Sequence, residues 1–219
     1  MRLAFAMIAL SGLIAPAYAQ PDVVSAGRLV FERGTKVGRA ACAACHMPDA
    51  AGQPDVGIPR LAGLTESYIA DQLNYFASSA RENAAMSAYA KLLSPGQRLE
   101  VAAYLQSIPI PASADMPAPP ASQLARGAQV FLNGDEHSGL LACAQCHGPT
   151  ALGVGDFSPR LAGQSAPYVM SQLEGWQAGN VRDPKGIYMR AIASHLTTAD
   201  LQAVAAYVAS LDGQGGQKP

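Results

Sequence analysis

The chain contains four cysteines, arranged as two pairs that are each followed directly by a histidine: Cys42, Cys45 and His46, then Cys143, Cys146 and His147. This Cys-x-x-Cys-His pattern is the attachment signature of c-type haem. Cysteines at i and i+3 of a helical turn project from one face, where they can form thioethers to two porphyrin substituents. The next histidine is then held against the iron. The sequence therefore predicts two covalently bound haem c groups, each ligated by one histidine.

Three other uses of these cysteines are weaker. A zinc site built from two such pairs usually separates them by about 15 to 20 residues, whereas Cys45 and Cys143 lie in opposite halves of the chain. A thioredoxin-like dithiol needs a βαβ setting, which the helical patterns described below do not offer. Structural disulfides suit an oxidising compartment, but they would not explain a histidine after each pair.

A six-coordinate haem iron needs a second axial ligand, and the candidate must recur in both halves of the chain. Met86 and Met189 are the only matched methionines outside the N-terminal segment, and they precede Leu93 and Leu196 at equivalent points. We predict that both are iron ligands, although methionine is more often a core filler. The two histidines without a counterpart, His137 and His195, are predicted to be surface or capping side chains. His195 is the substitute ligand if Met189 is not one.

The chain repeats itself. Residues 59–63 (PRLAG) recur at 159–163, and the segment VAAY at 101–104 recurs at 204–207. Self-similarity of this kind indicates two domains of one type. We assign residues 20–108 to the first domain, 109–122 to a Pro-rich extended linker, 123–212 to the second domain and 213–219 to a flexible tail.

Each copy reads as helical, which predicts an all-α fold. Apolar side chains recur at helical spacing in each half (Ile69, Leu73 and Phe76; Val169, Leu173 and Trp176). Two helix starts carry capping signals: Ser94 with Gln97, and Thr197 with Asp200. Gly27 and Gly127, each four residues before a phenylalanine, would let another helix approach closely.

The composition and the N-terminal residues limit which partners and which cellular compartment are expected. The chain has 219 residues, 14% of them charged, and a net charge of −1, which excludes the basic footprint of a nucleic-acid-binding protein. Arg2, an apolar run over 3–14 and an A-x-A motif at 17–19 predict a signal peptide over residues 1–19, cleaved after Ala19. The alternative is an uncleaved anchor, but the run is short for a membrane span.

The two haem motifs, the PRLAG segments with Tyr68, Gln72, Tyr168 and Gln172, the segments of Met86 and Met189, and the terminal AAY helices together resemble the dihaem cytochrome c4 family. The resemblance implies two tandem class I cytochrome c domains, each wrapped round one covalently attached haem c, with the haem edges facing each other. It also implies that Pro59 and Pro159 offer their carbonyls to the ring N–H of His46 and His147. Tyr104 with Phe31, and Tyr207 with Phe131, should lie where the first and last helices of each copy cross.

With histidine and methionine on both axial positions, no site on iron is left for a substrate, so the sequence predicts an electron carrier rather than an enzyme. We expect a periplasmic monomer that passes single electrons between a respiratory donor and a terminal oxidase or other redox protein. Peripheral membrane association and the identity of the donor stay open.

Two alternatives keep the two haem groups but give the chain another role. The chain could be the dihaem subunit of a periplasmic dehydrogenase such as flavocytochrome c sulfide dehydrogenase. It could also be a dihaem enzyme of the thiosulfate dehydrogenase or peroxidase type, in which one iron lacks its sixth ligand.

Overall fold

A computed structural model describes residues 22–35, 41–111, 118–156, 158–183, 185–214 and 216. The predicted signal peptide over 1–19, Met116 in the linker and residues 217–219 of the tail lie outside these ranges. The described residues form helices and no strand, apart from three isolated bridges within loops. No helix among them is both long enough and apolar enough to cross a bilayer.

The described residues of the first copy form five α-helices and one short 3-10 turn. In chain order these are α1 (Val23–Arg33), α2 (Ala43–His46), η1 (Pro54–Val56), α3 (Glu66–Ser78), α4 (Ala84–Ala90) and α5 (Pro95–Ser107). Helix α5 packs against both α1 and α3, and α4 packs on α3. Their apolar faces enclose one core, which includes Phe31, Leu73, Phe76 and Leu105.

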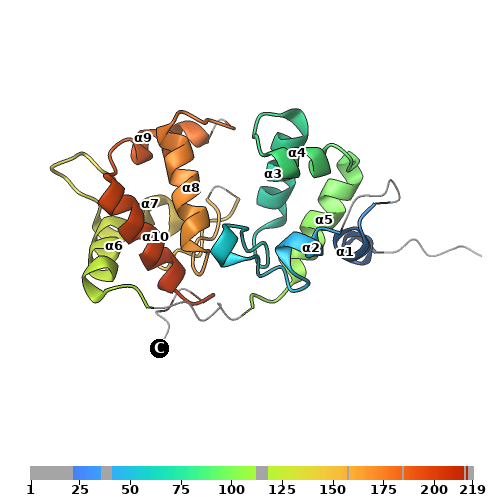
Figure 1. The fold of residues 1–219 in the computed structure, drawn as a ribbon, viewed down its shortest axis with the longest axis horizontal. Coiled ribbons are helices and arrows are strands. Elements are labelled where there is room, and N and C mark those ends of the chain that lie inside the picture. Colours follow the sequence, from blue (N-terminus) through green and yellow to red (C-terminus); the bar gives the residue numbers. More distant parts are fainter. Residues whose placement is uncertain are drawn as a thin grey trace, which may run out of the picture.

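The second copy repeats this order. Its helices are α6 (Ala121–Asn133), α7 (Ala144–His147), α8 (Ala166–Gln177), α9 (Gly186–Ala193) and α10 (Thr198–Ser210). Helix α10 packs against α6 and α8, and α9 packs on α8, around a separate core. Figure 1 shows the two copies side by side, with α1–α5 on the right and α6–α10 on the left. The predicted all-α fold of two tandem domains is confirmed.

The first and last helices of each copy cross at a glycine. A Cβ atom on Gly27 would lie 1.9 Å from the carbonyl oxygen of Glu100, so only glycine allows α1 and α5 to approach this closely. Phe31 and Tyr104 stack beside the crossing with ring centroids 5.6 Å apart. Phe131 and Tyr207 repeat that contact at 5.6 Å in the second copy. The crossing predicted from the sequence is confirmed in both domains.

Both capping boxes predicted for the last helices are present. The Ser94 hydroxyl accepts from the backbone N–H of Gln97, and the Gln97 side chain accepts from the Ser94 N–H. Thr197 and Asp200 form the same reciprocal pair at the start of α10. Each box satisfies backbone donors that the first helical turn leaves without a partner.

The two domains are joined by a buried polar contact as well as by the linker. The backbone N–H of Arg60 donates to the amide oxygen of Gln164, and the Gln164 amide nitrogen donates to the Arg60 carbonyl, both at 3.0 Å. The Arg60 guanidinium bonds the carbonyls of Ala62 at 2.6 Å and, across the interface, Ala162 at 2.8 Å. Leu64 occupies the position equivalent to Gln164, so this contact is formed once and has no symmetric counterpart.

Candidate haem-binding sites

The two Cys-x-x-Cys-His motifs fold as short helical turns. The backbone N–H of His46 donates to the Cys42 carbonyl at 2.9 Å, and His147 donates to Cys143 at the same distance. No disulfide links either pair; Cys42 and Cys143 are half-buried, whereas Cys45 and Cys146 are exposed. Burial raises the pKa of the Cys143 thiol to about 11, so this sulfur is uncharged at neutral pH.

The two motif histidines are buried and fixed in one tautomer. His46 is 6% exposed and His147 is 7% exposed. Their Nδ1 atoms lie 3.1 Å and 3.0 Å from the carbonyl oxygens of Pro59 and Pro159. A carbonyl only accepts, so Nδ1 carries the proton and Nε2 keeps the lone pair that a metal needs. Burial also lowers the pKa of both rings, which favours the neutral imidazole.

A tight loop carries each proline back to its histidine. Gly52 has φ +77°, and a Cβ there would lie 2.4 Å from the Ile58 carbonyl oxygen. Gly153 is constrained in the same way, with φ +83° and a Cβ position 2.5 Å from the Ser158 carbonyl oxygen. Each glycine N–H donates to the carbonyl of the motif histidine at 3.0 Å. Glycine is therefore required at both positions to close the loop.

The two matched methionines lie on short helices that follow α3 and α8. Met86 is in α4, where its backbone N–H is capped by the Asn83 side chain at 2.9 Å. Met189 is in α9. Both side chains are half-buried and pack on the same core as the first cysteine of their domain, Cys42 or Cys143. The structure thus places each predicted ligand in the domain that holds its partner histidine.

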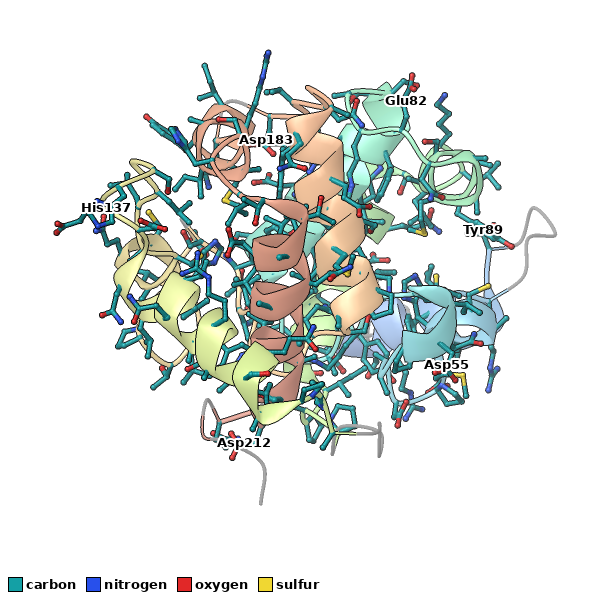
Figure 2. The ribbon with its side chains drawn as sticks, turned by 60° about the vertical axis from the view of Figure 1, so that its left-hand side comes forward. Asp55, Glu82, Tyr89, His137, Asp183 and Asp212 are labelled. Carbon is teal, nitrogen blue, oxygen red and sulfur yellow. The ribbon has the colours of Figure 1, made fainter. Side chains whose placement is uncertain are left out.

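The unmatched histidines lie elsewhere. The His195 ring is exposed. Its Nδ1 lies 2.7 Å from the Ser138 carbonyl oxygen and donates a hydrogen bond to it, because a carbonyl can only accept. It therefore ties α10's preceding turn to the loop over 134–141. His137 lies exposed on that same loop, which Figure 2 shows at the edge of the second domain. Neither histidine packs in the core with Met189.

The sequence did not reveal a polar cluster between the domains. Tyr68, Gln72 and Arg81 of the first domain face Tyr168, Gln172 and Arg182 of the second. The tyrosines and glutamines were visible as repeated residues, but the arginines follow α3 and α8 in irregular loops where periodicity gives no signal. Burial, then the neighbouring Tyr168, raises the pKa of Tyr68 to about 12. The phenol is therefore protonated and can donate a hydrogen bond.

Two buried donors test whether these residues fit a haem group. Trp176 Nε1 and Arg182 Nε are shielded from solvent and bond no atom of the protein. The Arg182 guanidinium lies 4.7 Å from the centre of the Trp176 ring, so the two N–H groups belong to one locality. Haem carries two carboxylate side groups, and a carboxylate is an acceptor that both donors can use. The residues present fit a haem with an acidic edge at this place.

Two helical domains, each with a buried histidine on a Cys-x-x-Cys-His turn, define a tandem c-type cytochrome. The family model for cytochrome c matches residues 31–109 and 124–212. The chain belongs to the cytochrome c family. It is a dihaem protein of the cytochrome c4 type that carries electrons, with two covalent haem c groups.

Relatives and solved structures agree with this assignment. A thiosulfate dehydrogenase electron acceptor from Thiomonas intermedia is 45% identical over 172 residues, which are 78% of this chain and 78% of the relative. Cytochrome c4 from Pseudomonas stutzeri has a TM-score of 0.73 at 27% identity, covering 87% of this chain and 98% of that one. A thiosulfate dehydrogenase from Marichromatium purpuratum has a TM-score of 0.77 at 36% identity. It covers 86% of this chain, which spans only 40% of that longer chain.

Proposed function

We propose that this dihaem cytochrome is a periplasmic carrier that accepts electrons from a thiosulfate dehydrogenase and passes them singly to a respiratory acceptor such as a terminal oxidase. The observation that carries the proposal is the 45% identity to a thiosulfate dehydrogenase electron acceptor, which extends over both domains. The longer solved chain from Marichromatium purpuratum supports it, because there a similar pair of domains occurs within a thiosulfate dehydrogenase.

Four cysteines and four axial ligands would hold the two haems. Thioethers to Cys42 and Cys45, and to Cys143 and Cys146, would attach them. His46 with Met86, and His147 with Met189, would occupy the axial positions of the two irons. The carbonyls of Pro59 and Pro159 accept hydrogen bonds from the histidine rings and so orient them. When bound, each haem supplies a one-electron couple whose potential is raised by a methionine ligand.

This ligand set favours a carrier over an enzyme. If a histidine and a methionine both hold each iron, no place would be left there for a substrate, and the chain's residues would have only to attach, orient and enclose the redox groups. Two couples suit a donor of this kind, since oxidative coupling of two thiosulfate ions releases two electrons. The chain then stores both and releases them one at a time.

A lasting complex with the dehydrogenase is the second candidate, favoured by the same longer chain from Marichromatium purpuratum. The names of the relatives point to a thiosulfate dehydrogenase and not to a flavoprotein partner.

Cleavage of the predicted signal peptide after Ala19 would release the mature chain into the periplasm, where covalent haem attachment and a sulfur-oxidising partner are both expected.

Mixing experiments test the proposal. Oxidised holoprotein is combined anaerobically with a purified thiosulfate dehydrogenase and thiosulfate, and the rise of the reduced haem α-band is followed. We expect both haems to be reduced, and no reduction when thiosulfate is added without the dehydrogenase. Rapid reduction by thiosulfate alone would show that the chain is itself the enzyme. Size-exclusion chromatography of the mixture separates a transient carrier from a stable subunit.

A further inference from the structure

Arg81 connects the two domains through one guanidinium. Its Nη1 donates to the Gln72 side chain of its own domain at 2.7 Å. Its Nη2 donates to two groups of the other domain, the Tyr168 hydroxyl at 3.1 Å and the Gln172 side chain at 2.8 Å. The cation of the first domain is therefore held mainly by α8 of the second.

The matching arginine of the second domain reaches the same point. Arg182 Nη1 donates at 2.6 Å to the Gln172 oxygen that Arg81 already uses. Two half-buried cations thus converge on a single neutral acceptor. Burial, and then the charge of Arg81, lower the pKa of Arg182. The two guanidinium groups repel each other where they meet.

No acidic side chain of the described residues forms an ion pair with either guanidinium, although the charge of the nearby Asp183 acts on both and favours their protonated forms. The ion pairs that the described residues form lie away from Arg81 and Arg182, on α1 and around Arg126. Asp183, next to Arg182, turns its carboxylate to the backbone N–H of Gly186 at 2.8 Å. Figure 2 labels Glu82 and Asp183, the sequence neighbours of the two arginines, at the same end of the molecule. Two cations brought together away from bulk water are stabilised when an anion pairs with them.

We propose that Arg81 and Arg182 form one anion site shared by the carboxylate groups of both haems, and that Arg81 sets the reduction potential of the haem in the other domain as well as its own. The inference rests on the proposed haem ligation. A fixed positive charge stabilises the reduced haem, which carries one positive charge fewer than the oxidised haem. Removal of the Arg81 charge therefore lowers both potentials.

The test is a spectroelectrochemical titration of full-length holoprotein with Arg81→Gln. We expect the reduced-to-oxidised ratio at a fixed ambient potential to fall at least threefold for both haems, which is about 28 mV on the scale of 59 mV per decade. Arg98→Gln is the matched control. Arg98 lies in the same domain but bonds only the Asn74 side chain and the Leu93 carbonyl, so both potentials should stay within 1.5-fold (on the order of 10 mV) of the wild type.

The effect on the second haem is isolated in a Met86→His background. That change should move the first haem to a much lower potential and leave the second haem as a separate wave. Adding Arg81→Gln must then lower the remaining wave. A shift confined to the first haem overturns the proposal. If Met86→His moves neither wave, the proposed ligation has failed, which is a different result from failure of the shared site.

A second variant covers the case in which Arg81→Gln does not accumulate. Gln172→Glu keeps the shape of the side chain and places a carboxylate between the two guanidinium groups, where it competes with the haem carboxylates. We expect it to lower both potentials at unchanged haem content, as measured by the pyridine haemochrome assay. Potentials that stay at the wild-type values in this variant contradict the shared anion site.

Discussion

The side-chain amide of Gln164 exchanges two hydrogen bonds with the main chain of Arg60, each 3.0 Å long. A backbone N–H and a backbone C=O of one domain are thus satisfied by one side chain of the other, as they would be by a neighbouring strand. Both residues are nearly inaccessible, with exposures of 5% and 3%. Because buried main-chain groups need partners, this pair holds the two domains in one relative orientation.

Gln164→Leu introduces the side chain found at the equivalent position 64 and removes both bonds. The Arg60 N–H and C=O are left buried without a partner, which we expect to cost about 1–3 kcal/mol of interface stability. Small-angle scattering should show a wider spread of domain orientations, and electron exchange between the haems should slow. Gln106→Leu is the control, since Gln106 bonds only the Glu66 N–H within its own domain. Unchanged scattering by Gln164→Leu contradicts the role of this pair.

Met86→Ala and Met189→Ala test the proposed axial ligands one at a time. Each variant should lose the absorption band that arises from methionine sulfur bound to ferric iron at one haem only. Its reduced form should bind carbon monoxide at that haem, because a coordination position opens. The wild type should bind none without denaturation. A Met189→Ala protein that still has two six-coordinate haems would point to His195 or another substitute.

Gly27→Ala tests the helix crossing. The new Cβ would overlap the Glu100 carbonyl oxygen, so α1 and α5 must separate, and we expect a loss of about 1–3 kcal/mol or more in the free energy of unfolding. Gly96→Ala in the first turn of α5 is the control. The nearest atom to its Cβ is 3.9 Å away, and we expect a gain of up to about 1 kcal/mol from the stiffer unfolded chain. Equal stabilities in thermal unfolding would show that the crossing is not constrained.

Asp200 makes the capping box of the last helix sensitive to acid in the second domain, whereas the matching box of the first domain has no carboxylate. Burial raises the pKa of this carboxyl, but hydrogen bonds from Arg126 and Thr197 outweigh it and hold the pKa below its ordinary value. Its contribution is therefore complete above the unfolded pKa of about 4 and is lost as the pH falls through the lower folded value. Asp200→Asn should cost about 1 kcal/mol at neutral pH and less in acid.

Denaturant unfolding at neutral and acid pH measures this difference. The equivalent capping box in the first domain uses the neutral Gln97, so Gln97→Ala should lower stability by the same amount at both pH values. An Asp200→Asn penalty that does not shrink in acid would mean that the carboxylate charge contributes nothing.

Much of this architecture could be predicted from the sequence because it depends on local patterns. The all-α fold and the starts of α5 and α10 follow from periodic apolar residues and from caps at Ser94 and Thr197. The short helices α4 and α9 could not be predicted in this way. They have only 7 and 8 residues, too few for a periodic stripe to stand out, so Met86 and Met189 were found by repeat position rather than by helix pattern.

The residues of the site also differ in how far the sequence alone could predict them. The motif cysteines and histidines are contiguous, so the sequence shows them directly. Arg60 was visible only as part of a repeated segment, and its pairing with Gln164 joins residues about a hundred positions apart. Arg81 and Arg182 lie in irregular loops, and their convergence on Gln172 depends on how the domains dock. No local signal encodes such docking, because it results from tertiary packing.

Gln164 bonds Arg60 across the domain junction, but its counterpart Leu64 forms no matching contact. This asymmetry affects how a chain with two similar domains can change. In a symmetric dimer of one-domain chains, every substitution would occur on both sides of the contact. Here position 64 is leucine while position 164 is glutamine, and Arg60 is buried at the junction whereas Arg160 is only half-buried and bonds Gly213. The two halves are thus not equivalent at this junction. The near-identical segments around the two motif histidines therefore lie in different surroundings, so a substitution at this junction changes one half of the molecule without its counterpart in the other.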